Sequence, residues 1–247
     1  MNEHLSRAIL IIDSLIRRGD VDRAKEILKM FNVTGVEVSS GEVKESRVRV
    51  SELFSKQYLR RTVLLWILWF VLVYTYHGIF IWLKAFFVKT KVIPDPLLFY
   101  FIVTLVQIPG YVSATLLLDV IGRKALLAAY LLLSGIGCLG FSLANDFTSV
   151  LLTSSVISFF NLGAWAGLYT YTPELYPTRV RGTGAGSAAS FGRIGGILQG
   201  PLTGIVLSSM GLYGTFIKFS VLHWIAAVAV IVLGLETKGR RLEEISK

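Results

Sequence analysis

A short charged stretch, 171-YTPELYPTRVRGTGAG-186, interrupts two long apolar runs. Its Glu174, Arg179 and Arg181 are able to form ion pairs, and Pro173 and Pro177 are expected to end the preceding apolar helix and stiffen its exit. Surface ion pairs are individually worth about 0–1 kcal/mol, so a cluster of them biases a conformational equilibrium without locking it. The stretch is therefore typical of a gate that closes in one conformation and opens in another.

A second charged turn, 119-DVIGRK-124, supplies partners for such a gate. An acid ends one apolar run, Gly122 allows a tight turn, and basic residues open the next run. Taken alone, the turn also fits a simpler role in which its basic residues only fix the orientation in a membrane. Considered with the first stretch, it predicts a gate cluster on the cytoplasmic side. The residues of this cluster are Asp119, Arg123, Glu174, Arg179 and Arg181.

Arg193 is a strongly charged residue well inside an apolar run. Placing arginine near the centre of a membrane helix costs about 2.5–3.5 kcal/mol, so the side chain should face water or a partner. We predict that it binds a carboxylate or other anionic group of a substrate, with snorkelling toward the cytoplasm or a structural ion pair as alternatives. Polar and aromatic residues in other runs are candidates for the same cavity, although a lone buried histidine is more often a core residue. These candidates are His77, Tyr74, Gln107, Asn161 and Trp165.

The elements that must position these residues are long and apolar. The 247 residues are 53% hydrophobic and 17% charged, whereas a soluble domain has about 25% charged residues. Six runs reach the roughly 20 residues that cross a hydrocarbon core as a helix. They cover residues 62–83, 97–118, 125–145, 150–171, 185–209 and 216–235. The predicted fold class is an all-α membrane protein, with six transmembrane helices in a domain of residues 61–247.

The distribution of positive charge predicts the topology. Twenty of the 25 Lys and Arg residues fall in segments on one side of such a bundle, and only four fall on the other. Because the positive side is cytoplasmic, we expect a multi-pass protein of the cell membrane with both termini in the cytoplasm. The net charge of +9 then reflects topology, and the expected partners are a small-molecule substrate and the lipid bilayer, with no nucleic acid. No cofactor and no metal site are predicted.

Residues 1–60 are predicted to form a separate cytoplasmic helical segment. Apolar residues recur at helical spacing in 5-LSRAILIIDSLIRR-18 and again in 21-VDRAKEILKMF-31. This pattern predicts a helical hairpin followed by a flexible linker, and an amphipathic helix on the membrane surface is the alternative.

Glycines in the fifth run predict a packing surface. Small residues at four-residue spacing let a second helix approach closely, either as a static contact or as a gliding surface. Pro109 with Gly110 also predicts a kink in the second run. The glycines of the stripe are Gly192, Gly196, Gly200 and Gly204.

Four motifs resemble the major facilitator superfamily, in its sugar-porter and metabolite:proton symporter branches. They are 173-PELYPTRVRGTG-184, 119-DVIGRK-124, 236-ETKGRRLEEI-245 and 17-RRGDVDRAKEILKMF-31. The resemblance implies a fold of two six-helix halves that rock about a central site, of which this chain matches the C-terminal half. A missing N-terminal six-helix half is then the expected partner, and the chain is expected to be inactive by itself.

The chain also departs from the sugar-porter pattern. Val120 replaces the first arginine of the loop motif, Leu235 replaces the proline of the tail motif, and 74-YTYHG-78 lacks the paired glutamines typical of hexose carriers. The resemblance therefore implies a small polar or anionic metabolite. Proton coupling is expected for this branch, yet no Asp or Glu lies near the middle of a run. The coupling acid is expected in the other half, with His77 as the alternative.

The expected function is transport of such a metabolite by alternating access, as the C-terminal half of a secondary carrier. An intramembrane enzyme is disfavoured, because the runs hold neither a Gly-x-Ser-x-Gly motif nor an acidic pair. A non-transporting membrane adaptor or a channel-like protein is the alternative.

Overall fold

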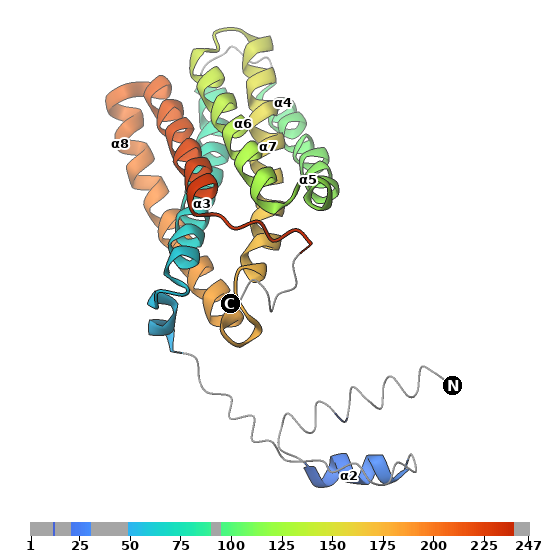
Figure 1. Ribbon diagram of the computed structural model, residues 1–247. Coiled ribbons are helices and arrows are strands. Elements are labelled where there is room, and N and C mark those ends of the chain that lie inside the picture. Colours follow the sequence, from blue (N-terminus) through green and yellow to red (C-terminus); the bar gives the residue numbers. More distant parts are fainter. Residues whose placement is uncertain (1–11, 13–20, 31–48, 90–94, 240–247) are drawn as a thin grey trace. The chain divides into compact units, whose positions relative to one another are not determined.

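The computed structural model describes residue 12 and residues 21–30, 49–89 and 95–239 (Figure 1). All regular elements in these ranges are helices. The chain divides into two compact units, Met1–Arg47 and Val48–Lys247. In the first unit, α2 (Val21–Met30) covers the second apolar stripe, whereas nearly all of the first stripe lies outside the described residues.

The second unit is a bundle of long helices. Five helical segments in the described residues are long and apolar enough to cross a membrane. They are α3 (Leu59–Lys89), α4 (Pro96–Leu105) joined to α5 (Gln107–Ile121), α6 (Arg123–Leu143), α7 (Phe147–Glu174) and α8 (Thr178–Leu233). A short 3-10 helix, η1 (Val50–Phe54), precedes them.

The last element, α8, folds back on itself (Figure 1). Its 56 residues would extend about 84 Å as one helix, far beyond the roughly 30 Å hydrocarbon core. Gly211 interrupts it with φ 63° and ψ −163°, a conformation that glycine adopts without a steric penalty. We call residues 178–210 the first arm of α8 and residues 212–233 the second arm. The two arms contain the fifth and sixth apolar runs.

The helix is interrupted at Val106, between α4 and α5, close to the kink predicted from Pro109 and Gly110. Pro109 lacks an N–H group, and its ring collides with the carbonyl group four residues earlier, at Leu105, where α4 ends. Gly110 has a different role, because a Cβ atom there would overlap the carbonyl oxygen of Phe159. It therefore allows α5 and α7 to pack closely.

The charged stretch that follows the fourth apolar run is a tight turn. The helix α7 continues through Pro173 to Glu174, and Pro177 is the N-cap of α8. The turn therefore brings the charged side chains close to the helix ends. We call this end of the bundle the Glu174 end and the opposite end the Gly211 end.

The compact second unit begins before the predicted boundary at residue 60. Leu53 of η1 is fully buried, and its carbonyl oxygen accepts a hydrogen bond from Thr62 Oγ1 at 2.9 Å. Tyr58 is also buried against α3 and Tyr176. Residues 49–60 are therefore packed onto the bundle.

Only the first half of the predicted glycine stripe packs against a helix. A Cβ atom on Gly192 would lie 3.1 Å from the carbonyl oxygen of Trp69, whereas one on Gly200 would meet no atom within 4 Å. A helix turns about 100° per residue, so residues spaced by four drift from one face, by about 120° over twelve residues. The buried face instead follows the helical period. Its residues are Gly184, Ala188, Gly192, Gly195, Gln199 and Thr203.

Candidate functional site

A cavity of about 270 Å³ opens between α3, α5, α7 and the first arm of α8. Three of the predicted binding residues, His77, Trp165 and Arg193, meet in this cavity. The residues from α7 are spaced by three and four positions, and those from α3 by four, three and one, so each helix presents one side to it. The complete lining is Trp69, Val73, Tyr76, His77, Tyr111, Leu162, Trp165, Tyr169 and Arg193.

The walls of the cavity are mainly aromatic. The ring of Trp69 meets Trp165 edge to face at 5.7 Å between centroids and meets Tyr169 at 5.4 Å. The Trp69 indole N–H donates to Thr172 Oγ1 at 3.0 Å, which holds the ring in place. Tyr76 adds a further edge contact to Trp165 at 6.1 Å. A cavity lined in this way favours a planar ligand with a large apolar surface.

Two side chains supply polar groups to the cavity. Arg193 is exposed, and none of the residues that the structure describes forms an ion pair or hydrogen bond with its guanidinium group. Its planar donors match a carboxylate in two parallel hydrogen bonds. His77 Nδ1 lies 2.8 Å from the carbonyl oxygen of Val73, which can only accept. Nδ1 therefore acts as the donor in this contact, and Nε2 is the ring nitrogen left for a ligand.

The other three predicted binding residues do not line this cavity. Tyr74 is buried, and its hydroxyl accepts a hydrogen bond from Lys218 Nζ at 2.9 Å. Asn161 is fully buried, and its Nδ2 donates to His223 Nε2 at 2.9 Å. Gln107 is buried at the start of α5.

Sequence reasoning missed most of the aromatic lining. Trp69 lies eight positions before His77, close to two helical turns, and Tyr76 lies seven positions after Trp69, again close to two turns. Tyr169 follows Trp165 by four positions, on the same face of α7. Projection from the two predicted residues onto their helix faces is therefore the signal that would have found these rings.

At the Glu174 end, ion pairs join the turn between α5 and α6 to the end of α7. Arg123 Nη1 lies 2.8 Å from Asp119 Oδ1, and Arg123 Nε lies 3.1 Å from Glu174 Oε2. The side chains of Arg123 and Glu174 are only 17% and 23% exposed, so solvent screens their pair weakly. Asp119 is 82% exposed and contributes less.

The segment after α8 completes this cluster, which sequence reasoning did not anticipate. The carboxylate of Glu236 accepts hydrogen bonds from the backbone N–H groups of Arg123 at 3.0 Å and Lys124 at 3.2 Å. These are the first N–H groups of α6, so Glu236 caps that helix. Thr237 Oγ1 donates to Glu174 Oε2 at 2.5 Å, and Lys238 Nζ donates to the carbonyl oxygen of Val120 at 2.6 Å. The ETK triplet of the tail motif thus bonds the ends of α5, α6 and α7.

Arg179 and Arg181 lie outside this cluster. Arg179 Nη2 pairs with Glu52 Oε2 of η1 at 2.6 Å, and this hydrogen bond lowers the pKa of the Glu52 carboxyl group. Arg181 donates to the carbonyl oxygen of Tyr176 and to Thr178 Oγ1, each at 3.3 Å. The structure therefore separates the five predicted gate residues into a central cluster and two peripheral arginines.

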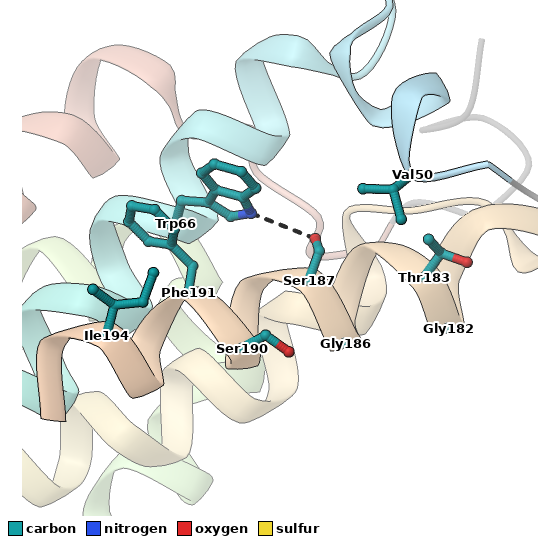
Figure 2. Close-up of a pocket in the computed structure, with 9 residues that line it drawn as sticks. All are labelled: Val50, Trp66, Gly182, Thr183, Gly186, Ser187, Ser190, Phe191 and Ile194. Atoms are coloured by element: carbon teal, nitrogen blue, oxygen red, sulfur yellow. Dashed lines mark hydrogen bonds between the residues drawn. The ribbon is translucent and has the colours of Figure 1, made fainter. Parts of the chain in front are cut away.

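A second hollow, of about 470 Å³, lies between η1, the start of α3 and the first arm of α8 (Figure 2). The indole of Trp66 stacks on Phe191 at 4.4 Å between centroids, and its N–H donates to Ser187 Oγ at 3.4 Å. None of the described residues that line it is charged. The rest of its floor is made of small residues along α8, namely Gly182, Thr183, Gly186 and Ser190. Such a surface suits close contact with another helix better than it suits binding of an ion.

Comparison with known proteins shows which family the chain resembles. The model of the family described as Sugar (and other) transporter matches residues 9–247. The chain is 36% identical, over 95% of its length, to the niacin transporter NiaP of Acinetobacter baylyi. It is 38% identical, over 78% of its length, to the putative niacin/nicotinamide transporter NiaP of Bacillus subtilis. It is 29% identical, over 82% of its length, to a synaptic vesicle 2-related protein of Xenopus laevis.

The matched regions amount to 55%, 49% and 40% of these three proteins. The chain therefore spans about half the length of the curated relatives that it matches. Membership of a transporter family confirms the expectation that the chain is not an enzyme. With the family model matched over nearly all of its length and apolar helices throughout the second unit, this chain belongs to the sugar (and other) transporter family of the major facilitator superfamily.

Proposed function

We propose that this chain is one half of a secondary carrier that moves a small aromatic carboxylate, of the niacin class, across the cell membrane by alternating access. The observation that carries this proposal is the guanidinium group of Arg193, which has no partner among the described residues, in a cavity walled by aromatic rings. The printed names of two relatives, which refer to niacin, support the same class of substrate.

The proposed binding mode follows from the two kinds of group in the cavity. A planar ring fits beside the indoles of Trp69 and Trp165, where stacking contributes about 0.5–1.5 kcal/mol beyond burial. The carboxylate then accepts hydrogen bonds from Arg193, and charged hydrogen bonds contribute about 1.5–3 kcal/mol. His77 presents a second polar edge to the ligand. A hexose has no charge for Arg193 and no flat aromatic face for the indoles.

The membrane topology proposed here has six spans, with α8 counted as two. The positive charge bias favours the Glu174 end as the cytoplasmic end and puts both termini in the cytoplasm. Residues 1–47 then precede the membrane unit on the cytoplasmic side. In this topology Gly211 lies at the outer surface.

Alternating access requires a second six-helix half, which we propose as the partner of this chain. The uncharged hollow at Trp66 and the small residues along α8 suit contact with a helix of that half (Figure 2). The cluster around Arg123 and Glu174 then serves as the cytoplasmic gate. The described spans hold no acid at mid-depth, so the proposed proton coupling places its carboxylate in the other half.

Uptake of radiolabelled niacin tests the proposal, in cells that produce this chain together with its proposed second half. Arg193→Gln should raise KM for niacin by about tenfold or more, because a charged hydrogen bond is worth about 1.5–3 kcal/mol. Arg193→Lys should recover part of the loss, and KM for nicotinamide, which lacks the carboxylate, should change little. Unchanged niacin uptake and KM in Arg193→Gln would sink the proposal. A flux that rises linearly without saturation would favour the channel-like alternative.

A further inference from the structure

Three serines inside the bundle have hydroxyl groups without a hydrogen-bond partner in the described part of the chain. They are Ser134 of α6 and Ser154 and Ser158 of α7, and all are essentially fully buried. Other hydroxyl groups on α7 donate to a carbonyl oxygen of their own helix, as Thr153 does to Ser149 at 2.6 Å. The three serines therefore lie where a further partner is needed.

Helix contacts place Ser134 opposite the part of α7 between Ser158 and Asn161. A Cβ atom on Gly137 of α6 would lie 3.0 Å from Ile157 of α7, and one on Gly163 would overlap the ring of Tyr130. Because α6 and α7 run antiparallel, the positions between these contacts face each other in reverse order. Ser134 is thus opposite the turn of α7 that carries Asn161 and, one turn before it, Ser158.

The second arm of α8 closes the same region. Ser220 Oγ donates to the carbonyl oxygen of Gly135 at 2.8 Å, which brings this arm beside Ser134. One turn further, His223 Nε2 accepts from Asn161 Nδ2, and His223 Nδ1 lies 2.8 Å from the carbonyl oxygen of Phe219. Both ring nitrogens are therefore occupied, whereas Asn161 Oδ1 is buried and has no partner among the described residues.

The polar row on α7 leads to the substrate cavity. Ser154, Ser158, Asn161 and Trp165 are separated by four, three and four positions, so they follow one face of the helix. The indole N–H of Trp165 is also buried, and no residue that the structure describes accepts from it, while its ring lines the cavity. The row therefore runs from the interior of the bundle to the cavity wall.

We propose that Ser134, Ser154, Ser158 and Asn161 bind a file of buried water molecules between α6, α7 and the second arm of α8, which reaches the substrate cavity at Trp165. Lipid offers no hydrogen-bond partner, so a dry hydroxyl or amide oxygen at this depth is destabilising. Buried waters typically bond to such groups, with about three hydrogen bonds each. The hydroxyl groups, the amide oxygen and the indole N–H together supply the donors and acceptors that water requires.

The water file gives the cavity wall freedom to move. Hydrogen bonds through water re-form at new distances, whereas direct bonds between helices are lost when the helices shift. The helix α7 carries Leu162, Trp165 and Tyr169 into the cavity. A hydrated contact with α6 thus lets α7 adjust as the carrier changes conformation, independently of which substrate the cavity takes.

Hydroxyl-radical labelling of the carrier in lipid nanodiscs tests this proposal, because brief X-ray pulses generate radicals from bound water as well as from bulk water. Cys138 is a built-in reporter, since it is fully buried one turn after Ser134 and thiols react rapidly with these radicals. We expect fast oxidation of Cys138 in the unchanged protein and a drop of about fivefold or more in Ser134→Val/Ser158→Val. The matched control is Ser142→Ala, one turn beyond Cys138, whose hydroxyl already donates to Leu139 O at 2.6 Å and whose loss should not alter the rate.

Slow oxidation of Cys138 in the unchanged protein, or an equal rate in the double variant, would overturn the proposal. A second measurement covers the case in which the valine variant fails to fold. Ser158→Ala should lower the unfolding temperature if the hydroxyl group is bonded to water, and should raise it or leave it unchanged if the hydroxyl group is dry. The second of these results also overturns the proposal.

Discussion

The Glu174 end and the cavity between α3, α5, α7 and α8 each contain an arginine, but the two side chains have opposite surroundings. Arg123 bonds to Asp119, to Glu174 and to a backbone carbonyl oxygen, and its own N–H is held by Glu236. Arg193 has no such partner in the part of the chain that the structure describes. A charge that is satisfied within the protein holds one conformation, whereas an open charge at membrane depth requires a partner from outside.

The largest expected effect comes from reversing the satisfied charge. Arg123→Glu would bring a fourth carboxylate to Asp119, Glu174 and Glu236. The four carboxylates would repel one another and destabilise the packing at the Glu174 end. We expect the maximal uptake rate to fall about tenfold or more, equivalent to about 1.4 kcal/mol, while KM changes little. Initial-rate uptake assays measure both quantities. Lys56→Glu, an exposed charge reversal in the segment before α3, is the control, and an equal loss in that variant would contradict a specific gate.

A smaller effect is expected from the cavity wall. Trp165→Leu removes the ring contacts with Trp69 and Tyr76 but leaves Arg193 in place. Stacking contributions of about 0.5–1.5 kcal/mol predict a rise of about two- to tenfold in KM, equal for niacin and nicotinamide. Competition assays with both compounds separate this effect from that of Arg193→Gln. A rise in KM for niacin alone would show that the aromatic ring and the charge do not act separately.

Loss of the contact between Glu236 and α6 should have a smaller effect still, and the effect should be on thermal stability. Glu236→Gln weakens the cap on α6, and charge at a helix N-terminus is worth about 0.3–1 kcal/mol. The unfolding temperature should fall by about 1–4 °C, with KM unchanged. Thermal unfolding in detergent measures the shift. A fall in niacin affinity as large as that in Arg193→Gln would contradict the separation of the two regions.

The smallest effect is expected at the exposed pair of Glu52 and Arg179. Glu52→Gln should lower the unfolding temperature at pH 7 only slightly, since exposed pairs are screened and weak. Because the pKa of Glu52 is lowered in the folded protein, the pair stabilises it above the ordinary value of 4.5, and this contribution is lost as the pH falls below that value. Unfolding curves at several pH values should therefore converge for the two proteins under acidic conditions.

The apolar runs were a reliable guide to the helices, because backbone groups in lipid must bond within their own segment. Each run between residues 62 and 235 falls largely within a described helix or an arm of α8. The helices extend beyond the predicted runs, as α7 does to Glu174, because composition does not reveal how far a helix continues beyond the lipid. Single residues such as Arg193 and His77 could be selected because a charged or polar group is costly in an apolar run, and both line the cavity between α3, α5, α7 and α8.

The faces of the helices were harder to predict. Tyr74 and Asn161 are as polar as His77, yet they bond to Lys218 and His223, because their direction depends on helix rotation and on neighbours far along the chain. The contact of Glu236 with Arg123 joins positions 113 residues apart. Neither periodicity nor composition predicts contacts between residues so far apart in the sequence. The tail could therefore be recognised as a motif, but its contacts could not be predicted.

The break at Gly211 determines how movement is distributed along the first arm of α8. The two arms are connected there by one residue, so the connection has almost no slack at that end. If the first arm rotates against the second, Gly211 is the fulcrum. Arg193 lies about 27 Å from it along the helix and Gly182 about 44 Å, at 1.5 Å per residue. The same rotation therefore displaces the hollow at Trp66 more than it displaces the guanidinium group, and a large opening at the Glu174 end requires only a modest shift at the ligand.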